Sequence, residues 1–474
     1  MARHNIAPHD LNNMRWTKSY RAFLFLAVLT AVNALPGRRS WNFRSVEKVG
    51  SLEAAPVKGG LCDASVKSLS GYYKVTTAGK SNQNYFFWFF EARNQKPDTP
   101  TAMWLTGGPG CSSMMALLAE NGPCTVNKNL TTTPNPASWN NDVNIMWVDQ
   151  PTGVGFSYGD TGDYDHDEAG VAEDMYHFLQ SFFDANPSYR KNRFFVFGES
   201  YGGHYVPSVA NRVFIGNQAK EDTPINLAGI GIGNGLTNPE VQYQYYAEMA
   251  YNNSYGIKTV SKSQYDQMVK ATPACIEQIK KCQQDTSVCA AAQTSCNNAL
   301  IGPYEQGGLN PYDIRKPCGS NPLCYDFSQV TTFLNQQSTL DALHVSKESA
   351  KWTSCNYKVN ADFASDWMKE FEGKVAPMLE GGVQALVYAG DVDFICNWMG
   401  NKAWTLALPW SGKAAFNAAA DRDWVGHDGS KAGTVRSANG LTFLQINKAG
   451  HMVPMDQPDN ALLMFDTFTS GGKF

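Results

Sequence analysis

The stretch from residue 194 to residue 203, which reads Phe-Phe-Val-Phe-Gly-Glu-Ser-Tyr-Gly-Gly, constrains the fold more than any other part of the chain. Its first four residues are bulky and apolar, which predicts a short buried strand, and residues 204–214 have the pattern of a helix. Gly198 and Gly202 flank Ser200 in the order Gly-x-Ser-x-Gly, which is typical of a nucleophile elbow, a sharp strand-to-helix turn that exposes the serine hydroxyl. The alternative is an ordinary Gly/Ser turn, but the flanking strand and helix favour the elbow.

Other apolar runs predict strands that alternate with helical segments. We expect a hairpin-like region at 71–75 and 85–90, a helix at 168–184, and strands at 102–105, 144–148, 227–232, 385–388 and 441–446. This alternation predicts the α/β class and an α/β-hydrolase fold, with a central, mostly parallel sheet and helices on both faces. Residues 236–352 have a different texture, rich in Tyr, Gln and Cys. We therefore expect a core at 58–235 and 353–474, with 236–352 as a disulfide-rich cap over the carboxyl edge of the sheet.

The N-terminal region resembles a targeting segment. An apolar run at residues 22–32 follows Arg15, Lys18 and Arg21 and is too short to span a bilayer, which predicts a signal peptide over 1–34. Translation from Met14 would shorten its basic region. Residues 35–57 are expected to be a propeptide or N-terminal extension, with Arg38-Arg39 as a trimming site. The expected location is outside the cell, or a vacuole-like compartment, without membrane attachment after signal removal.

The net charge limits the kinds of partner that the protein can bind, and the cysteine content indicates the compartment in which it folds. A net charge of −4 and the lack of a Lys/Arg cluster argue against nucleic acid. Eleven cysteines in a secreted chain predict disulfides with one thiol left over. Four of them recur every seven residues, and a helical hairpin would pair Cys282 with Cys289 and Cys275 with Cys296; a zinc site is the disfavoured alternative. We expect Cys318 to pair with Cys324, and glycosylation at the sequons of Asn129 and Asn252.

A serine nucleophile needs a histidine base and a carboxylate that orients the histidine. In the expected fold the carboxylate follows the serine along the chain, and the histidine follows the carboxylate. His451 comes soon after the strand at 441–446, where its ring can reach the elbow. The strand at 385–388 delivers both Asp391 and Asp393 to the same edge, and spacing does not separate them. The other histidines after Ser200 fit less well: His204 should point along the helix, His427 lies in a polar loop, and His344 falls within the expected cap.

The glycine-rich loop at 106–110 supplies a candidate oxyanion hole. Such a hole needs backbone N–H groups directed at the developing negative charge. We expect one from Tyr201, the residue after the nucleophile, and the other from Gly108. A phosphate-binding loop is the alternative, but no Gly-Lys-Ser/Thr sequence follows.

Four segments together resemble the serine carboxypeptidases, with carboxypeptidase Y and the fungal secreted members as the nearest kind. They are residues 104–113, 198–207, 388–398 and 450–454, and the resemblance runs from about residue 70 to the C-terminus. It implies that Asp393 is the triad acid, that Cys396 is a free thiol beside the triad, and that Cys111 bridges to Cys355; Cys62 is then left to pair with Cys124. It also implies a leaving-residue pocket of Tyr312, Tyr325, Cys396 and Met452, and a site for the substrate carboxylate made by Thr106, Gly107, Glu120 and Glu199.

The resemblance implies an enzyme that releases C-terminal residues from peptides and proteins. Glu120 and Glu199 lie together in the family, and close buried carboxyls cannot both ionise readily, so activity should be best at acidic pH. Thr106 is a departure, because many relatives carry asparagine there, and a threonine hydroxyl reaches less far. An acyltransferase and a catalytically silent binding protein are the alternatives. No metal or cofactor is expected, and the oligomeric state stays open.

Overall fold

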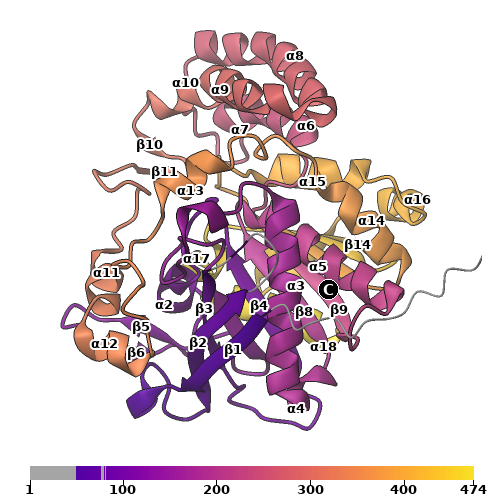
Figure 1. Ribbon diagram of the computed structural model, residues 1–474. Coiled ribbons are helices and arrows are strands. Elements are labelled where there is room, and N and C mark those ends of the chain that lie inside the picture. Colours follow the sequence, from indigo (N-terminus) through magenta and orange to yellow (C-terminus); the bar gives the residue numbers. More distant parts are fainter. Residues whose placement is uncertain (1–49, 76–79, 81) are drawn as a thin grey trace, which may run out of the picture. The chain divides into compact units, whose positions relative to one another are not determined.

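The structure is a computed structural model that describes residues 50–75, 80 and 82–474. The expected signal peptide and the Arg38-Arg39 pair lie outside the described residues. The described chain is built on a sheet of eleven strands in the order β1-β2-β3-β7-β4-β8-β9-β12-β15-β14-β13. Six neighbouring strands, from β7 to β15, run parallel, and the strands on either side are antiparallel. The large sheet is therefore mostly parallel at its centre, as expected (Figure 1).

The strands of this sheet are β1 (Gly50–Pro56), β2 (Ser68–Val75), β3 (Gln83–Phe90), β4 (Thr101–Thr106), β7 (Asn144–Val148), β8 (Phe194–Glu199), β9 (Leu227–Gly233), β12 (Gln384–Gly390), β13 (Arg422–Val425), β14 (Lys431–Ala438) and β15 (Leu441–Ile446). Two small hairpins add β5 (Cys124–Val126) with β6 (Thr132–Pro134), and β10 (Leu309–Asn310) with β11 (Asp313–Pro317). The helices are α2 (Met114–Ala119), α3 (Glu168–Ala185), α4 (Pro187–Arg190), α5 (Gly202–Ala219), α6 (Pro239–Gln242), α7 (Tyr246–Tyr251), α8 (Lys262–Gln284), α9 (Cys289–Leu300), α10 (Gly302–Glu305), α11 (Ser328–Leu334), α12 (Gln337–Ala342), α13 (Tyr357–Asp362), α14 (Val375–Glu380), α15 (Trp398–Ala407), α16 (Lys413–Ala418), α17 (Val453–Asp456) and α18 (Pro458–Ser470).

Helices cover both faces of the sheet, which explains why the central strands are continuous apolar runs. Side chains alternate between the faces along a strand. In β8, Phe194 and Val196 belong to the core that includes α3 and α5, whereas Phe195 and Phe197 belong to the core that includes α2 and α18. Every position of β8 is buried, so a polar side chain in either set would need a buried hydrogen-bond partner.

The long segment between β9 and β12 is mostly helical. It contains α6 to α14, and α8 and α9 form a hairpin closed by two disulfides. Figure 1 shows α8, α9 and α10 beyond one end of the sheet. The two strands that bracket the segment are parallel neighbours, with Tyr388 of β12 opposite Gly233 of β9. The segment therefore leaves the sheet and returns to it at adjacent strands.

Three strands at or next to the edges of the sheet, β1, β13 and β14, were not predicted, and the sheet begins before residue 58. β1 pairs with β2 along its whole length although the sequence analysis assigned its residues to a propeptide or extension. Most residues of β1 and β13 are exposed or only half-buried, because each has a neighbour on one side only. Their sequences consequently lack the apolar run that identifies a central strand.

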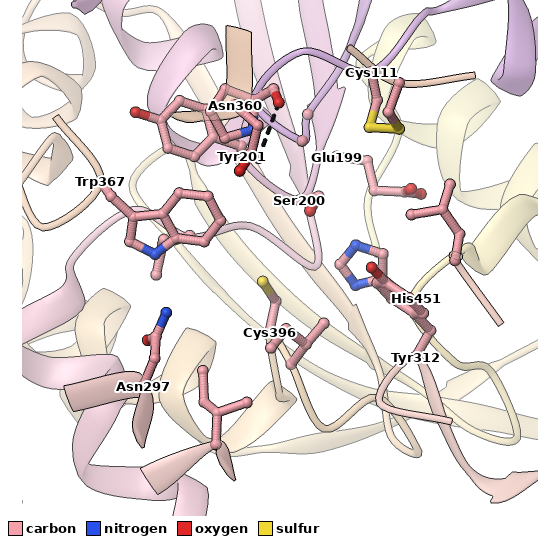
Figure 2. Close-up of a pocket in the computed structure, with 18 of the residues that line it drawn as sticks. Cys111, Glu199, Ser200, Tyr201, Asn297, Tyr312, Asn360, Trp367, Cys396 and His451 are labelled. Carbon is pink, nitrogen blue, oxygen red and sulfur yellow. Dashed lines mark hydrogen bonds between the residues drawn. A yellow bond between two sulfur atoms is a disulfide. The ribbon is translucent and has the colours of Figure 1, made fainter. Parts of the chain in front are cut away.

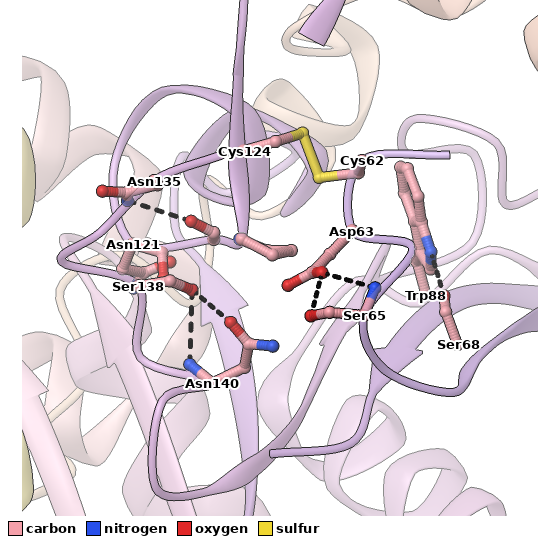
Figure 3. The surroundings of a disulfide bond; sticks show 12 residues. Cys62, Asp63, Ser65, Ser68, Trp88, Asn121, Cys124, Asn135, Ser138 and Asn140 are labelled. Atoms are coloured by element: carbon pink, nitrogen blue, oxygen red, sulfur yellow. Dashed lines mark hydrogen bonds between the residues drawn. A yellow bond between two sulfur atoms is a disulfide. The ribbon is translucent and has the colours of Figure 1, made fainter. Parts of the chain in front are cut away.

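The five disulfides join the pairs expected from the sequence, which are Cys62–Cys124, Cys111–Cys355, Cys275–Cys296, Cys282–Cys289 and Cys318–Cys324. Cys396 is the free thiol and is buried. Around Cys62–Cys124, Figure 3 shows a polar network in which Asp63 accepts hydrogen bonds from Ser65 and Ser138 donates to Asn140. The Cys62–Cys124 disulfide ties the segment before β2 to the start of β5.

Removing the Cys62–Cys124 bond by a double serine substitution should destabilise the protein more than removing Cys282–Cys289. The closed loops span 62 and 7 residues, and loop-closure entropy gives about 4 and about 2 kcal/mol, respectively. Urea unfolding of the two variants and the wild type measures both losses. An equal loss in the two variants would contradict the entropic argument.

Candidate active site

Ser200 sits on the sharp turn between β8 and α5. Its φ of 63° is in the left-handed region that non-glycine residues rarely adopt. Two hydrogen bonds fix the turn: the Ser200 N–H donates to the Gly233 carbonyl at 3.1 Å, and its carbonyl accepts from the Leu236 N–H at 2.9 Å. Gly198 is required because a Cβ there would lie 2.5 Å from the Leu105 carbonyl oxygen. The strand-turn-helix predicted from the Gly-x-Ser-x-Gly pattern is present.

His451 and Asp393 meet at the carboxyl edge of the sheet. β12 and β15 are parallel neighbours, so the loops that follow them leave the same edge. His451 Nδ1 lies 2.8 Å from Asp393 Oδ2, and both side chains are buried. Asp393 also accepts hydrogen bonds from the side chain of Asn234 at 2.8 Å and from the N–H groups of Ile395 and Cys396. Figure 2 shows the His451 ring directed toward Ser200 within one cavity.

Asp391, which spacing alone could not separate from Asp393, has a different role. Its carboxylate accepts hydrogen bonds from the Tyr255 hydroxyl at 3.0 Å and from the Lys448 N–H at 2.8 Å. Burial raises the pKa of Asp391 to about 6. Asp391 therefore joins three loops together and does not contact the histidine.

The other candidate histidines are placed elsewhere. His204 is buried within α5 with both ring nitrogens at carbonyl oxygens, those of Leu236 and Trp367, and burial lowers its pKa to about 4. His344 contacts the Pro56 carbonyl at 3.0 Å, and His427 is exposed. None of the three lines the cavity that contains Ser200.

The glycine-rich loop packs directly against the elbow. A Cβ on Gly107 would lie 2.3 Å from the Tyr201 backbone nitrogen, so only glycine allows this approach. Gly108 has a φ of +113°, which also requires glycine, and both Gly108 and Tyr201 line the cavity. Behind the loop, the buried Asp149 carboxylate accepts hydrogen bonds from Ser112 Oγ at 2.6 Å and the Ser113 N–H at 3.0 Å. Gly108 and Tyr201, the residues expected to supply the oxyanion donors, thus line the same cavity as Ser200.

Glu199 and Glu120 form a buried carboxyl pair beside Ser200. The two side chains share a hydrogen bond, and one oxygen of each has no hydrogen-bond partner within the described chain. Burial raises the pKa of Glu120 to about 7, and burial together with the charge of Glu120 raises the pKa of Glu199 well above its usual range. Glu199 lines the cavity, and Glu120 reaches it only through Glu199.

The cavity has a volume of about 350 Å³ and separates into two sides at Ser200. Figure 2 shows Glu199, His451 and Tyr312 on one side, and Tyr201, Trp367 and Asn297 on the other. Thr106, Met452 and Cys396 also line it. Tyr325 does not, although its ring packs on Tyr312 with centroids 5.9 Å apart.

The hydroxyl of Thr106 accepts a hydrogen bond from Trp104 Nε1 at 2.9 Å. Its own proton therefore stays available to a ligand in the cavity. Burial, followed by the charge of Asp393, raises the pKa of the Cys396 thiol well above its usual range, so it is not a reactive thiolate.

Sequence reasoning missed Asn234, whose side chain donates to Asp393 Oδ2 and accepts from the Gly390 N–H at 3.1 Å. It lies at the end of β9, between two glycines, with a φ of 40°. An asparagine in Gly-Asn-Gly at the end of a buried strand was the signal that could have identified it.

This fold and this arrangement of serine, histidine, aspartate and backbone donors define the α/β-hydrolase class. The family model for serine carboxypeptidase matches residues 59–471, and the chain belongs to that family. Serine carboxypeptidase-like 48 of Arabidopsis thaliana is 44% identical over 408 residues, which cover 85% of this chain and 78% of the relative. Carboxypeptidase Y of Komagataella phaffii is 41% identical over 410 residues, covering 85% and 76%. The crystal structure of Kex1(Δ)p, a prohormone-processing carboxypeptidase from Saccharomyces cerevisiae, matches with a TM-score of 0.78 at 27% identity, covering 88% of this chain and 94% of the other.

Two further features bear on the alternatives. Within the described residues, no three His, Cys, Asp or Glu side chains are grouped to hold a metal ion, and the four evenly spaced cysteines are all in disulfides. None of the helices in the described part of the chain is long and apolar enough to cross a membrane.

Proposed function

We propose that this protein is an active serine carboxypeptidase that releases single C-terminal residues from peptides and proteins at acidic pH. Ser200 is the nucleophile, His451 the base, Asp393 its orienting acid, and the N–H groups of Tyr201 and Gly108 the oxyanion donors. The observation that carries the proposal is a buried, protonatable carboxyl pair, Glu199 and Glu120, of which Glu199 lines the same cavity as Ser200 and the Asp393-bound His451. A serine esterase or endopeptidase has no use for such a pair.

The reaction proceeds through an acyl-enzyme. His451 takes the proton of Ser200 as Oγ bonds to the scissile carbonyl carbon, and the oxyanion is bound by the two backbone N–H groups. Collapse of the intermediate breaks the C–N bond, and His451 gives its proton to the leaving amine, so a free amino acid departs. Water then adds with proton transfer to His451, the ester bond to Oγ breaks, and the proton returns to Ser200.

The free end of the substrate is recognised by hydrogen bonds that depend on protonation. When both carboxyls are neutral, Glu120 donates to Glu199 and Glu199 donates to the substrate carboxylate. When Glu120 loses its proton to solvent, Glu199 stays protonated and donates its O–H to the Glu120 carboxylate. Glu199 then has no donor left for the substrate carboxylate and faces it with an oxygen lone pair. Thr106 and Gly107 supply the remaining donors, a hydroxyl and a backbone N–H. The leaving residue then lies toward Tyr312 and Met452, and the rest of the peptide toward Trp367 and Asn297.

Residues 236–352 are proposed to act as the cap that sets side-chain preference, because Asn297, Ile301 and Tyr312 line the cavity from within this segment. Secretion, or delivery to a vacuole-like compartment, is consistent with the five disulfides and with two exposed sequon asparagines, Asn129 and Asn252. An acyltransferase is disfavoured, because that reaction has no need of the Glu120–Glu199 pair.

A pH series on matched substrates tests the proposal. For a blocked dipeptide with a free C-terminus, KM should be low at acidic pH and rise as the pH passes about 7, where Glu120 ionises and the donor to the substrate carboxylate is lost. The amide of the same dipeptide should show no such rise, because it has no carboxylate to be repelled. If KM rises equally with pH for the free acid and the amide, carboxyl-pair recognition is contradicted. If no amino acid is released from either substrate, the proposed function is contradicted.

A further inference from the structure

The side chain of Tyr201 is held by the buried carboxylate of Asp366, which the catalytic arrangement described above does not use. The Tyr201 hydroxyl donates to Asp366 Oδ2 at 2.9 Å, and both side chains are buried. The Tyr201 ring is stacked on His204 with centroids 4.2 Å apart, and it also contacts Trp367 at 5.4 Å. The residue that offers an N–H to the oxyanion therefore has its side chain fixed at both the ring and the hydroxyl.

The first turn of α5 holds the carbonyl of Tyr201, which accepts hydrogen bonds from the N–H groups of His204 at 2.9 Å and Tyr205 at 3.3 Å. Tyr201 is the N-cap of α5, and it makes no side-chain capping hydrogen bond there. Within the part of the chain that the structure describes, the Tyr201 N–H donates to no backbone carbonyl. It is therefore free to donate to a ligand. The position of this N–H thus depends on the backbone hydrogen bonds to the Ser200 and Tyr201 carbonyls, on the contact with Gly107, and on the anchored side chain.

The same short segment also builds the cavity wall. Trp367 follows Asp366 directly, its carbonyl contacts His204 Nε2 at 3.2 Å, and its indole N–H donates to the Tyr243 hydroxyl oxygen at 3.2 Å. Trp367 and Tyr243 both line the cavity, and Figure 2 shows Trp367 on the side away from Glu199. Residues 366–367 consequently connect the cavity wall formed by Trp367 to Tyr201, whose N–H is the proposed oxyanion donor.

We propose that Asp366 is a positioning residue, which through the Tyr201 hydroxyl holds the Tyr201 N–H at the place where the oxyanion forms. The inference rests on the proposed function for its substrate but concerns a step common to any acyl transfer at Ser200. An oxyanion donor acts only if it is already in place when the charge develops. Loss of the anchor should therefore lower the rate of acyl transfer more than it weakens substrate binding.

The test compares variants that remove only the anchor. In Tyr201→Phe the ring and the backbone remain and the hydroxyl is lost; we expect kcat to fall about tenfold with KM within twofold. Asp366→Leu should match it, and the double variant should be no slower than the slower single variant, because one bond is removed in each case. Asp366→Asn keeps a carbonyl oxygen that accepts from Tyr201 and should retain most of kcat. Affinity for a phosphonate analogue of the tetrahedral intermediate should fall in Tyr201→Phe by the same factor as kcat/KM.

Tyr189→Phe is the matched control. The Tyr189 hydroxyl donates to Glu91 Oε1 at 2.5 Å, so this variant also removes a tyrosine–carboxylate bond, and neither residue lines the cavity. It should lower the unfolding temperature as Tyr201→Phe does and leave kcat unchanged. Equal kcat losses in the two variants, or an unchanged kcat in Tyr201→Phe, would overturn the proposal.

Each rate is also measured on a blocked amino-acid ester, which needs the oxyanion donors but no carboxylate recognition. If the wild type hydrolyses the ester and releases no amino acid from peptides, the proposed function fails, and the ester rates still decide the role of Asp366.

Discussion

Substitution of Ser200 by alanine should lower kcat for release of C-terminal residues by about 10⁴- to 10⁶-fold, leaving KM little changed. The hydroxyl is the atom that forms the acyl bond, and nothing else in the cavity can replace it. His451 and Asp393 act only through that hydroxyl, so Ser200→Ala/His451→Ala should be no slower than Ser200→Ala alone. Single-turnover and steady-state rates on a blocked dipeptide at acidic pH measure the loss.

Ser208→Ala provides the control for this substitution. Ser208 lies on the same helix, α5, is buried, and its hydroxyl has no hydrogen-bond partner among the described residues. Its loss should leave kcat and KM unchanged. Activity of Ser200→Ala within tenfold of the wild type, or a double variant much slower than the single one, would show that the nucleophile lies elsewhere.

Substitutions of Glu199 should separate recognition of the free carboxylate from catalysis. Glu199→Ala removes the donor and should raise KM for a free-acid dipeptide about 10- to 100-fold at acidic pH, the value of a hydrogen bond to a charged group. KM for the corresponding amide should change less than threefold. Glu199→Gln keeps an N–H donor that does not titrate, so the rise of KM near pH 7 should disappear.

The sign of the pH effect follows from the raised pKa values. A carboxyl whose pKa is raised stays protonated, and able to donate, at pH values where an ordinary carboxyl is ionised; the donor is lost as the pH rises through the raised value. Glu305→Gln is the control, since Glu305 lines the same cavity and is exposed. If Glu305→Gln flattens the pH profile, or Glu199→Gln does not, the pair is not the group that titrates.

The central strands and the elbow could be predicted from the sequence because each is a local pattern. Residues 194–197 of β8 are all apolar since both faces of the strand are covered, and the glycines around Ser200 are there because the turn leaves no room for a Cβ. The edge strand β13 and its neighbour β14 could not be predicted in this way. Arg422, Asp423 and Val425 of β13 are exposed, so the strand has no hydrophobic periodicity that distinguishes it from a loop.

Long-range pairings in the site were harder to predict. Asp391 and Asp393 both follow β12, and only the family resemblance favoured the second. The difference between them depends on Tyr255 and Lys448, which hold Asp391, and on Asn234, which holds Asp393. These partners are 57 to 159 residues away along the chain, and no local pattern indicates them.

The adjacency of β9 and β12 has a consequence for how this scaffold can change. Because the excursion between these strands starts and finishes at neighbouring positions, its ends are already close together, and a replacement of another length would meet only a small closure entropy. Ser200 precedes the excursion, while Asp393 and His451 follow it, so a grafted segment that kept Asn234 and Asp366 would alter which peptides enter without rebuilding the triad. Peptide preference could thus be exchanged by recombination or by design, provided that the contacts of Asn234 with Asp393 and of Asp366 with Tyr201 are retained.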